Sequence, residues 1–212
     1  MGILRNGIAG NYSGKIGNLV FYVRNGKQVV RTTGKMTKPP TEGQLKNRKE
    51  LKVVIDFLKP IKEFINAGFA LAAKGTTKIP HNLAVSHNKR HALQGIYPDV
   101  EMDYTKVLVT QGKIPDVSDC NVELTAEGLH FTWTCPNNLY WPRDSDQVML
   151  LAYFPVLEKA IYQLASVKRL VCAETLSIGT GMLNEYMEVY ISFVSADRKA
   201  IANSIYLGSF NQ

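Results

Sequence analysis

The sequence is poor in the residues that build metal centres and disulfide frameworks. Its 212 residues include three cysteines and four histidines. Cys120, Cys135 and Cys172 are odd in number and widely spaced, which is typical of free thiols in a reducing compartment. His87 and His91 stand four residues apart but lack the glutamate of an HExxH zinc motif. We therefore predict no metal site and no cofactor.

Long apolar runs are also missing. No stretch approaches the roughly 18 apolar residues that a membrane-spanning helix needs, and the N-terminus lacks the apolar core of a secretory signal. Gly2 fits a myristoylation signal, but Asn6 stands where that signal requires serine or threonine. We expect a chain made in the cytoplasm, without membrane insertion.

Catalytic signatures are absent as well. The stretch GNYSGKIG resembles a phosphate-binding loop, yet only three residues separate Gly10 from Gly14-Lys15, and Ile16 stands where a Walker loop needs a hydroxyl. No GxSxG elbow occurs, and no cysteine lies in a basic helical setting. The acidic run at Asp99, Glu101 and Asp103 lacks the other ligands of a calcium loop, which favours a solvated linker. We predict that the chain is not an enzyme.

Positive charge, by contrast, is abundant and unevenly placed. The net charge of +7 divides into +12 over residues 1–113, with 19 basic and 7 acidic residues, and −5 over residues 114–212, with 6 and 11. The first 52 residues alone hold 11 basic and 2 acidic residues. A segment of this charge attracts a polyanion or an acidic protein surface.

Residues 18–33, NLVFYVRNGKQVVRTT, predict a β-hairpin. Asn25-Gly26 allows positive φ at both central turn positions, and apolar and polar residues alternate on either side. Alternation places Phe21 and Val23 on one face and Tyr22 and Arg24 on the other. The glycine-rich segment before the hairpin should be extended and depend on contacts made elsewhere. The candidate partner-binding residues, for an assembly contact or a polyanion, are Lys15, Arg24, Lys27, Arg31, Lys35 and Lys38.

The rest of the chain changes from helical to strand periodicity. Apolar residues at helical spacing predict helices over residues 41–59, 60–74 and from Pro80 to about Gly95. From about residue 105, short strands separated by turn signals, the first of them TKVLVTQG at residues 105–112, predict an antiparallel β-sandwich of immunoglobulin or fibronectin III style, with Trp133 in its core. The predicted fold class is α+β, with a basic hairpin and helical domain over 1–104 and a sandwich domain over 105–212.

Four segments together resemble an uncharacterised family of bacterial and bacteriophage proteins, known only as a domain of unknown function. They are GIAGNYSGKIGNLVFYVRNGKQVVR, TEGQLKNRKELKVVIDFLKPIKEFINAGF, NLAVSHNKRHALQGIYPDVEMDYTKVLVTQGKIP and VYISFVSADRKAIANSIYLG. The resemblance implies an N-terminal SGKxG hairpin with helices joined to an immunoglobulin-like end, and it carries no assigned catalytic residues. In the final turn, SADRK stands where the family usually has a glycine.

Three functions remain open at this point. The first is a non-enzymatic structural protein of a phage or phage-like virion, made in the bacterial cytoplasm, whose basic arm binds other subunits in a homo- or hetero-oligomer. The second is a cytoplasmic accessory protein that binds nucleic acid without sequence preference through the same basic residues. The third is a surface or carbohydrate-binding adhesin that uses Tyr140 and Trp141 in the loop CPNNLYWPRDSD.

Overall fold

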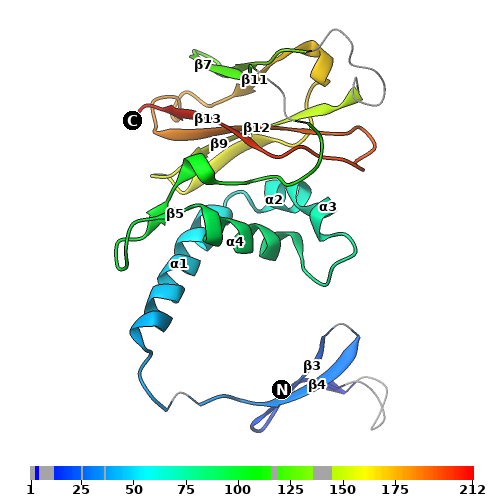
Figure 1. Ribbon diagram of the computed structural model, residues 1–212, viewed down its shortest axis with the longest axis vertical. Coiled ribbons are helices and arrows are strands. Elements are labelled where there is room, and N and C mark those ends of the chain that lie inside the picture. Colours follow the sequence, from blue (N-terminus) through cyan, green and yellow to red (C-terminus); the bar gives the residue numbers. More distant parts are fainter. Residues whose placement is uncertain (1–2, 5–11, 25, 36, 116–118, 136–144) are drawn as a thin grey trace. The chain divides into compact units, whose positions relative to one another are not determined.

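A computed structural model describes residues 3–4, 12–24, 26–35, 37–115, 119–135 and 145–212 (Figure 1). The chain divides into two compact units, residues 1–42 and 43–212. The sequence-based expectation placed a boundary between residues 104 and 105. The division falls earlier because the helices after residue 42 share a hydrophobic core with the strands of the C-terminal part.

The first unit is a four-stranded antiparallel sheet in the order β1-β2-β3-β4. Its strands are β1 (Ile3–Leu4), β2 (Tyr12–Ile16), β3 (Leu19–Arg24) and β4 (Lys27–Thr32). The predicted hairpin is confirmed, since β3 pairs with β4 from Leu19 opposite Thr32 to Arg24 opposite Lys27. Asn25 of the predicted turn lies outside the described residues, whereas Gly26 has the positive φ of +73° that such a turn requires.

The second unit begins with helices α1 (Glu42–Leu58), α2 (Lys62–Gly68), α3 (Ala70–Ala73) and α4 (Pro80–His91). The helix predicted over residues 60–74 is divided at Phe69, which is fully buried. The third predicted helix begins at Pro80 as expected and ends at His91. Leu93–Gln94 (β5) then pairs with Glu101–Met102 (β6), so a small two-stranded sheet replaces the last predicted helical turn. Among the described residues, no helix is long and apolar enough to span a membrane.

The strands of the second unit form two antiparallel sheets, and the α+β class is confirmed. One sheet has the order β10-β9-β12-β13 and the other the order β11-β8-β7. These strands are β7 (Asn121–Thr125), β8 (Gly128–Thr132), β9 (Gln147–Phe154), β10 (Lys159–Gln163), β11 (Ala173–Ser177), β12 (Met187–Val194) and β13 (Ile205–Phe210). Three strands packed on four make an immunoglobulin- or fibronectin III-like sandwich. As predicted, Trp133 is buried in its core.

The helices cover the outer face of the four-stranded sheet, so the second unit has three layers (Figure 1). Along β9, Leu150 and Ala152 lie in the core between the sheets, while Leu151 and Tyr153 lie in the core beneath the helices. This is the alternation that a β-strand imposes. Both faces of β9 are buried from Val148 to Phe154, which explains the unbroken apolar run VMLLAYF.

The strand expected at residues 105–112 is not present, and this expectation was wrong. Tyr104–Lys106 form a short 3₁₀ helix, and the backbone that follows makes no strand ladder. Its hydrogen bonds go elsewhere: the Leu108 backbone pairs with the Asn88 side chain, and the Val109 N–H donates to the Ser204 hydroxyl at 2.9 Å. Through these hydrogen bonds the segment connects α4 to the residues before β13.

Candidate functional site

Four of the six predicted partner-binding residues share one face of the N-terminal sheet. Val20 on the central strand β3 pairs with Lys15 on β2 and with Arg31 on β4. Arg24 and Lys27 face each other at the hairpin end. Because directly paired residues point to the same side and alternate along each strand, these four side chains form a basic face.

All four side chains of this basic face are exposed, and they make no salt bridge within the part of the chain that the structure describes. The remaining predicted residues, Lys35 and Lys38, are exposed too but lie beyond β4, outside any strand. The structure thus brings together Lys15, Arg24, Lys27 and Arg31 and leaves the other two on the segment that follows.

The opposite side of this sheet is apolar. The same register places on this side the apolar residues Ile16, Leu19, Phe21, Val23 and Val30. Ile16, Val23 and Val30 are each about half exposed, at 52%, 49% and 50%. No described side chain between residues 12 and 42 is buried. This apolar face therefore has no core of its own.

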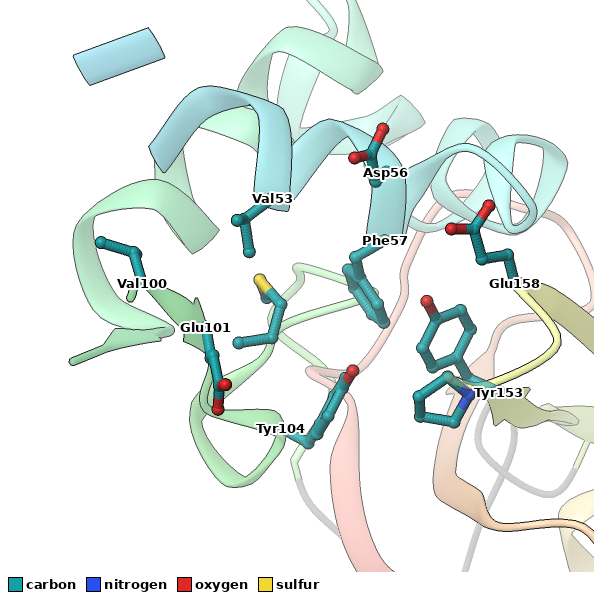
Figure 2. Close-up of a pocket in the computed structure, with 10 residues that line it drawn as sticks. Val53, Asp56, Phe57, Val100, Glu101, Tyr104, Tyr153 and Glu158 are labelled. Carbon is teal, nitrogen blue, oxygen red and sulfur yellow. The ribbon is translucent and has the colours of Figure 1, made fainter. Parts of the chain in front are cut away.

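A second candidate site, which the sequence analysis did not predict, is a pocket of about 310 Å³ in the second unit (Figure 2). It lies between the C-terminal half of α1, the β6 segment and the turn after β9. Its lining consists of Val53, Asp56, Phe57, Val100, Glu101, Met102, Tyr104, Tyr153, Pro155 and Glu158. We call it the acidic pocket, because every charged group in this lining is a carboxylate.

Three aromatic rings form one side of the acidic pocket. The Phe57 and Tyr153 ring centroids lie 4.8 Å apart, and Tyr104 lies 6.0 Å from Phe57 and 5.9 Å from Tyr153. Burial, and to a smaller extent the carboxylates of Glu158 and Asp56, together raise the pKa of Tyr153 to about 12. Tyr153 is therefore a neutral phenol at physiological pH, in a negative local potential.

A larger depression of about 860 Å³ lies on another part of the second unit. Its apolar base includes Leu71, Leu83 and Ile201, and three lysines border it, namely Lys74, Lys113 and Lys199. Its chemistry is opposite to that of the acidic pocket, since the described charges around it are positive. The side chains are exposed surface lysines, which alone specify no ligand.

Glu188 and Cys135, two further polar side chains of the second unit, have structural partners. Glu188, which is 2% exposed, accepts hydrogen bonds from the hydroxyls of Tyr186 and Tyr206, the latter at 2.7 Å. Burial raises the pKa of the Cys135 thiol to about 11, and a hydrogen bond with Cys172 adds to this effect. Such a thiol is protonated at neutral pH and is a poor nucleophile.

Among the described residues, the histidines considered for metal binding are not part of a metal site. The rings of His87 and His91 lie 4.8 Å apart, and burial lowers the pKa of His87. Within the described ranges, no three histidine, cysteine or acidic side chains are grouped as a metal ion would require. Tyr140 and Trp141, on which the adhesin hypothesis rests, lie outside the described residues.

The fold defines an α+β protein in which helices cover one face of a fibronectin III-like sandwich. A model of a family of unknown function, DUF6266, matches residues 11–208, and the chain belongs to this family. The match includes the N-terminal sheet from β2 onward as well as the helices and the sandwich. Neither the curated proteins nor the solved structures include a significant match to the chain.

Proposed function

We propose that this protein is a non-enzymatic assembly protein whose N-terminal sheet binds partner subunits. The observation that supports the proposal most directly is the apolar face of that sheet, which no other described part of residues 1–42 covers. A sheet that is apolar on one side is stable when a second layer covers that side, and small sheets without such a layer are marginal in water. Here Val23 and Val30 are half exposed, so a partner subunit would supply the missing layer.

Charge indicates what kind of partner fits. Residues 1–42 hold seven basic residues and one acidic residue, which gives +6, whereas residues 43–212 hold 18 and 17, which gives +1. A small unit of this charge is steered toward a negatively charged surface. We therefore propose an acidic protein partner that packs its own apolar residues against the sheet.

The most specific form of the proposal is a structural component of a phage or phage-like particle, made in the bacterial cytoplasm and then incorporated into the virion. Particle proteins commonly hold neighbouring subunits together with N-terminal arms that gain a core only in the assembly. The resemblance to bacterial and bacteriophage proteins supports this setting, and the two-unit organisation separates such an arm from a self-contained C-terminal unit.

The test uses a variant that removes apolar character but keeps shape and strand propensity, Val23→Thr with Val30→Thr. The tagged full-length chain, either wild type or variant, is expressed in cells that carry the natural gene. Assembled particles are then separated from soluble protein on a density gradient. We expect the variant to remain in the soluble fraction while wild-type chain co-sediments. A matched control, Gln28→Thr on the same face, should co-sediment normally. Co-sedimentation of the double variant at the wild-type level would refute the docking role of this face.

A second candidate function has its own supporting observation. The basic face places Lys15, Arg31, Arg24 and Lys27 around Tyr22, which is the combination that sequence-independent nucleic-acid binding uses. Four phosphate contacts would give a slope of about −3.6 in log affinity against log salt concentration on duplex DNA.

Replacing these four basic residues by glutamine tests the nucleic-acid candidate. If nucleic acid is the ligand, the variant loses DNA and RNA binding in a filter assay, while a Lys35→Gln and Lys38→Gln variant retains it. Absent or salt-insensitive binding by the wild-type chain would remove this candidate and leave the assembly proposal unaffected.

A further inference from the structure

The acidic pocket combines a deep phenol, an apolar base and unpaired carboxylates. It lies wholly within residues 43–212, so the inference below is independent of the function proposed for the N-terminal sheet. Its volume of about 310 Å³ is at the lower end of the range for small-ligand pockets. A ligand that fits it is therefore a single side chain or a small molecule.

The Tyr153 side chain is the deepest polar group of the pocket. The residue is 4% exposed, and Figure 2 shows its hydroxyl directed toward the space beside Phe57 and Glu158. Within the described part of the chain, this hydroxyl makes no hydrogen bond, whereas the buried hydroxyl of Tyr190 donates to the Tyr104 carbonyl at 2.9 Å. Because the Tyr153 hydroxyl lines the pocket and is not one of the fully buried unpaired groups of the described residues, a molecule that enters the pocket can be its partner.

Three carboxylates surround this phenol. Asp56 comes from α1, Glu101 from β6 and Glu158 from the turn between β9 and β10. All three side chains are exposed, and none forms a salt bridge among the described residues. Other surface carboxylates nearby do have cations, as in the contact of Asp103 with Lys106 at 2.6 Å. The pocket lining thus carries three negative charges that have no salt-bridge partner among the described residues.

The arrangement favours an organic cation over a metal ion. A metal needs several oxygen ligands on one centre, and no described group of three acidic, histidine or cysteine side chains is close enough to provide them. An alkyl chain, by contrast, would contact Val53, Val100 and Met102, which supply the apolar part of the lining. Aromatic rings beside such a chain add attraction for a positive charge.

We propose that the acidic pocket binds an organic cation, an ammonium or guanidinium group on a short apolar stem, with the Tyr153 hydroxyl accepting one N–H and Glu158 and Asp56 balancing the charge. Two sources have this chemistry, a free alkylamine and a lysine or arginine side chain of another protein. Both would place the stem over Met102 and the cation beside Tyr153.

The experiment follows methionine methyl groups by NMR in the full-length chain. Met102 lines the pocket, whereas Met187 lies in the core between the two sheets and serves as an internal control. The probes are n-butylammonium, propylguanidinium and an acetylated, amidated Ala-Lys-Ala peptide. The neutral alcohol 1-pentanol, of similar size, tests whether charge is required. We expect a saturable shift of the Met102 methyl with a cationic probe, no shift of Met187, and no saturable shift with 1-pentanol.

Two conservative variants test the assigned contacts. Tyr153→Phe keeps the ring packed against Phe57 and removes only the hydroxyl, and Glu158→Gln keeps the side-chain shape and removes the charge. Each should weaken binding of the cationic probe about tenfold, since each removes one hydrogen bond or charge contact to a charged group. Glu123→Gln, an exposed carboxylate on β7, is the matched control and should bind as the wild type does.

The probes also distinguish the source of the cation. Saturation by butylammonium or propylguanidinium alone supports a free organic cation, and saturation by the peptide alone supports a protein side chain. The proposal is overturned if no cationic probe gives a saturable Met102 shift, if 1-pentanol binds equally well, or if Tyr153→Phe and Glu158→Gln both bind as tightly as the wild type.

Discussion

Replacing Asn88 by alanine should destabilise the second unit strongly. Asn88 lies on α4 and is fully buried. Its amide nitrogen donates to the Leu108 carbonyl at 2.9 Å and to the Ala84 carbonyl at 3.1 Å, and its oxygen accepts from the Leu108 N–H at 2.8 Å. One side chain thus satisfies both backbone groups of Leu108, in a segment that has no strand partner.

The expected loss follows from these contacts. Alanine leaves the Leu108 N–H and carbonyl without partners, and each buried orphan costs about 1–3 kcal/mol. The better helix propensity of alanine offsets roughly half a kcal/mol, so the free energy of unfolding should fall by about 2–5 kcal/mol. For a protein of this size, about 2–4 °C of Tm is lost per kcal/mol, which predicts a Tm lower by about 4–20 °C.

Urea denaturation followed by tryptophan fluorescence measures this change, with a thermal scan as a second readout. The control is Ser86→Ala on the same helix, which removes only an exposed contact with Arg90 and should change stability by less than about 0.5 kcal/mol. A loss below about 1 kcal/mol for Asn88→Ala, with an unchanged denaturant slope, would show that the Leu108 backbone does not depend on this side chain.

Two further predictions concern the packing around this segment and the acidic pocket. Gly112→Ala should be strongly destabilising in a thermal scan, because an added Cβ would lie 1.9 Å from the Ile201 carbonyl oxygen, whereas Gly179→Ala, with open space around it, should leave the Tm almost unchanged. Glu158→Gln should lower the pKa of Tyr153 from about 12, since a neutral neighbour no longer opposes the phenolate, yet burial, its largest cause, should keep that pKa above 10. Ultraviolet titration of the tyrosines measures this shift, and an unchanged Tyr153 titration would contradict the placement of Glu158 beside the phenol.

Local sequence patterns were sufficient for the N-terminal sheet. The Asn25-Gly26 pair and the alternation on either side of it determine a two-residue turn and the faces of both strands. The separation of Phe21 from Tyr22 and Arg24 follows from that alternation and is confirmed by the register. Such features depend on residues only a few positions apart, which is why they can be read without the fold.

Other features depended on what packs against them. Residues 105–112 have the β-branched composition of a strand, but their backbone groups bond to Asn88 and Ser204, which lie 20 and 95 residues from their partners. The helix expected over residues 60–74 divides at Phe69, which is fully buried in the core between the helices and the four-stranded sheet. Tertiary contacts overrode local preference in both places.

The sequence by itself determined the α+β class, the strands and helices in outline, and the concentration of positive charge before residue 53. Only the tertiary structure decided that the helices and the sandwich share a core, and that Asp56, Glu101 and Glu158 border one pocket around Tyr153. The physical reason is distance along the chain. A hairpin or an amphipathic stripe is specified by neighbours, whereas a pocket joins segments about 50 residues apart, whose meeting depends on how the layers stack.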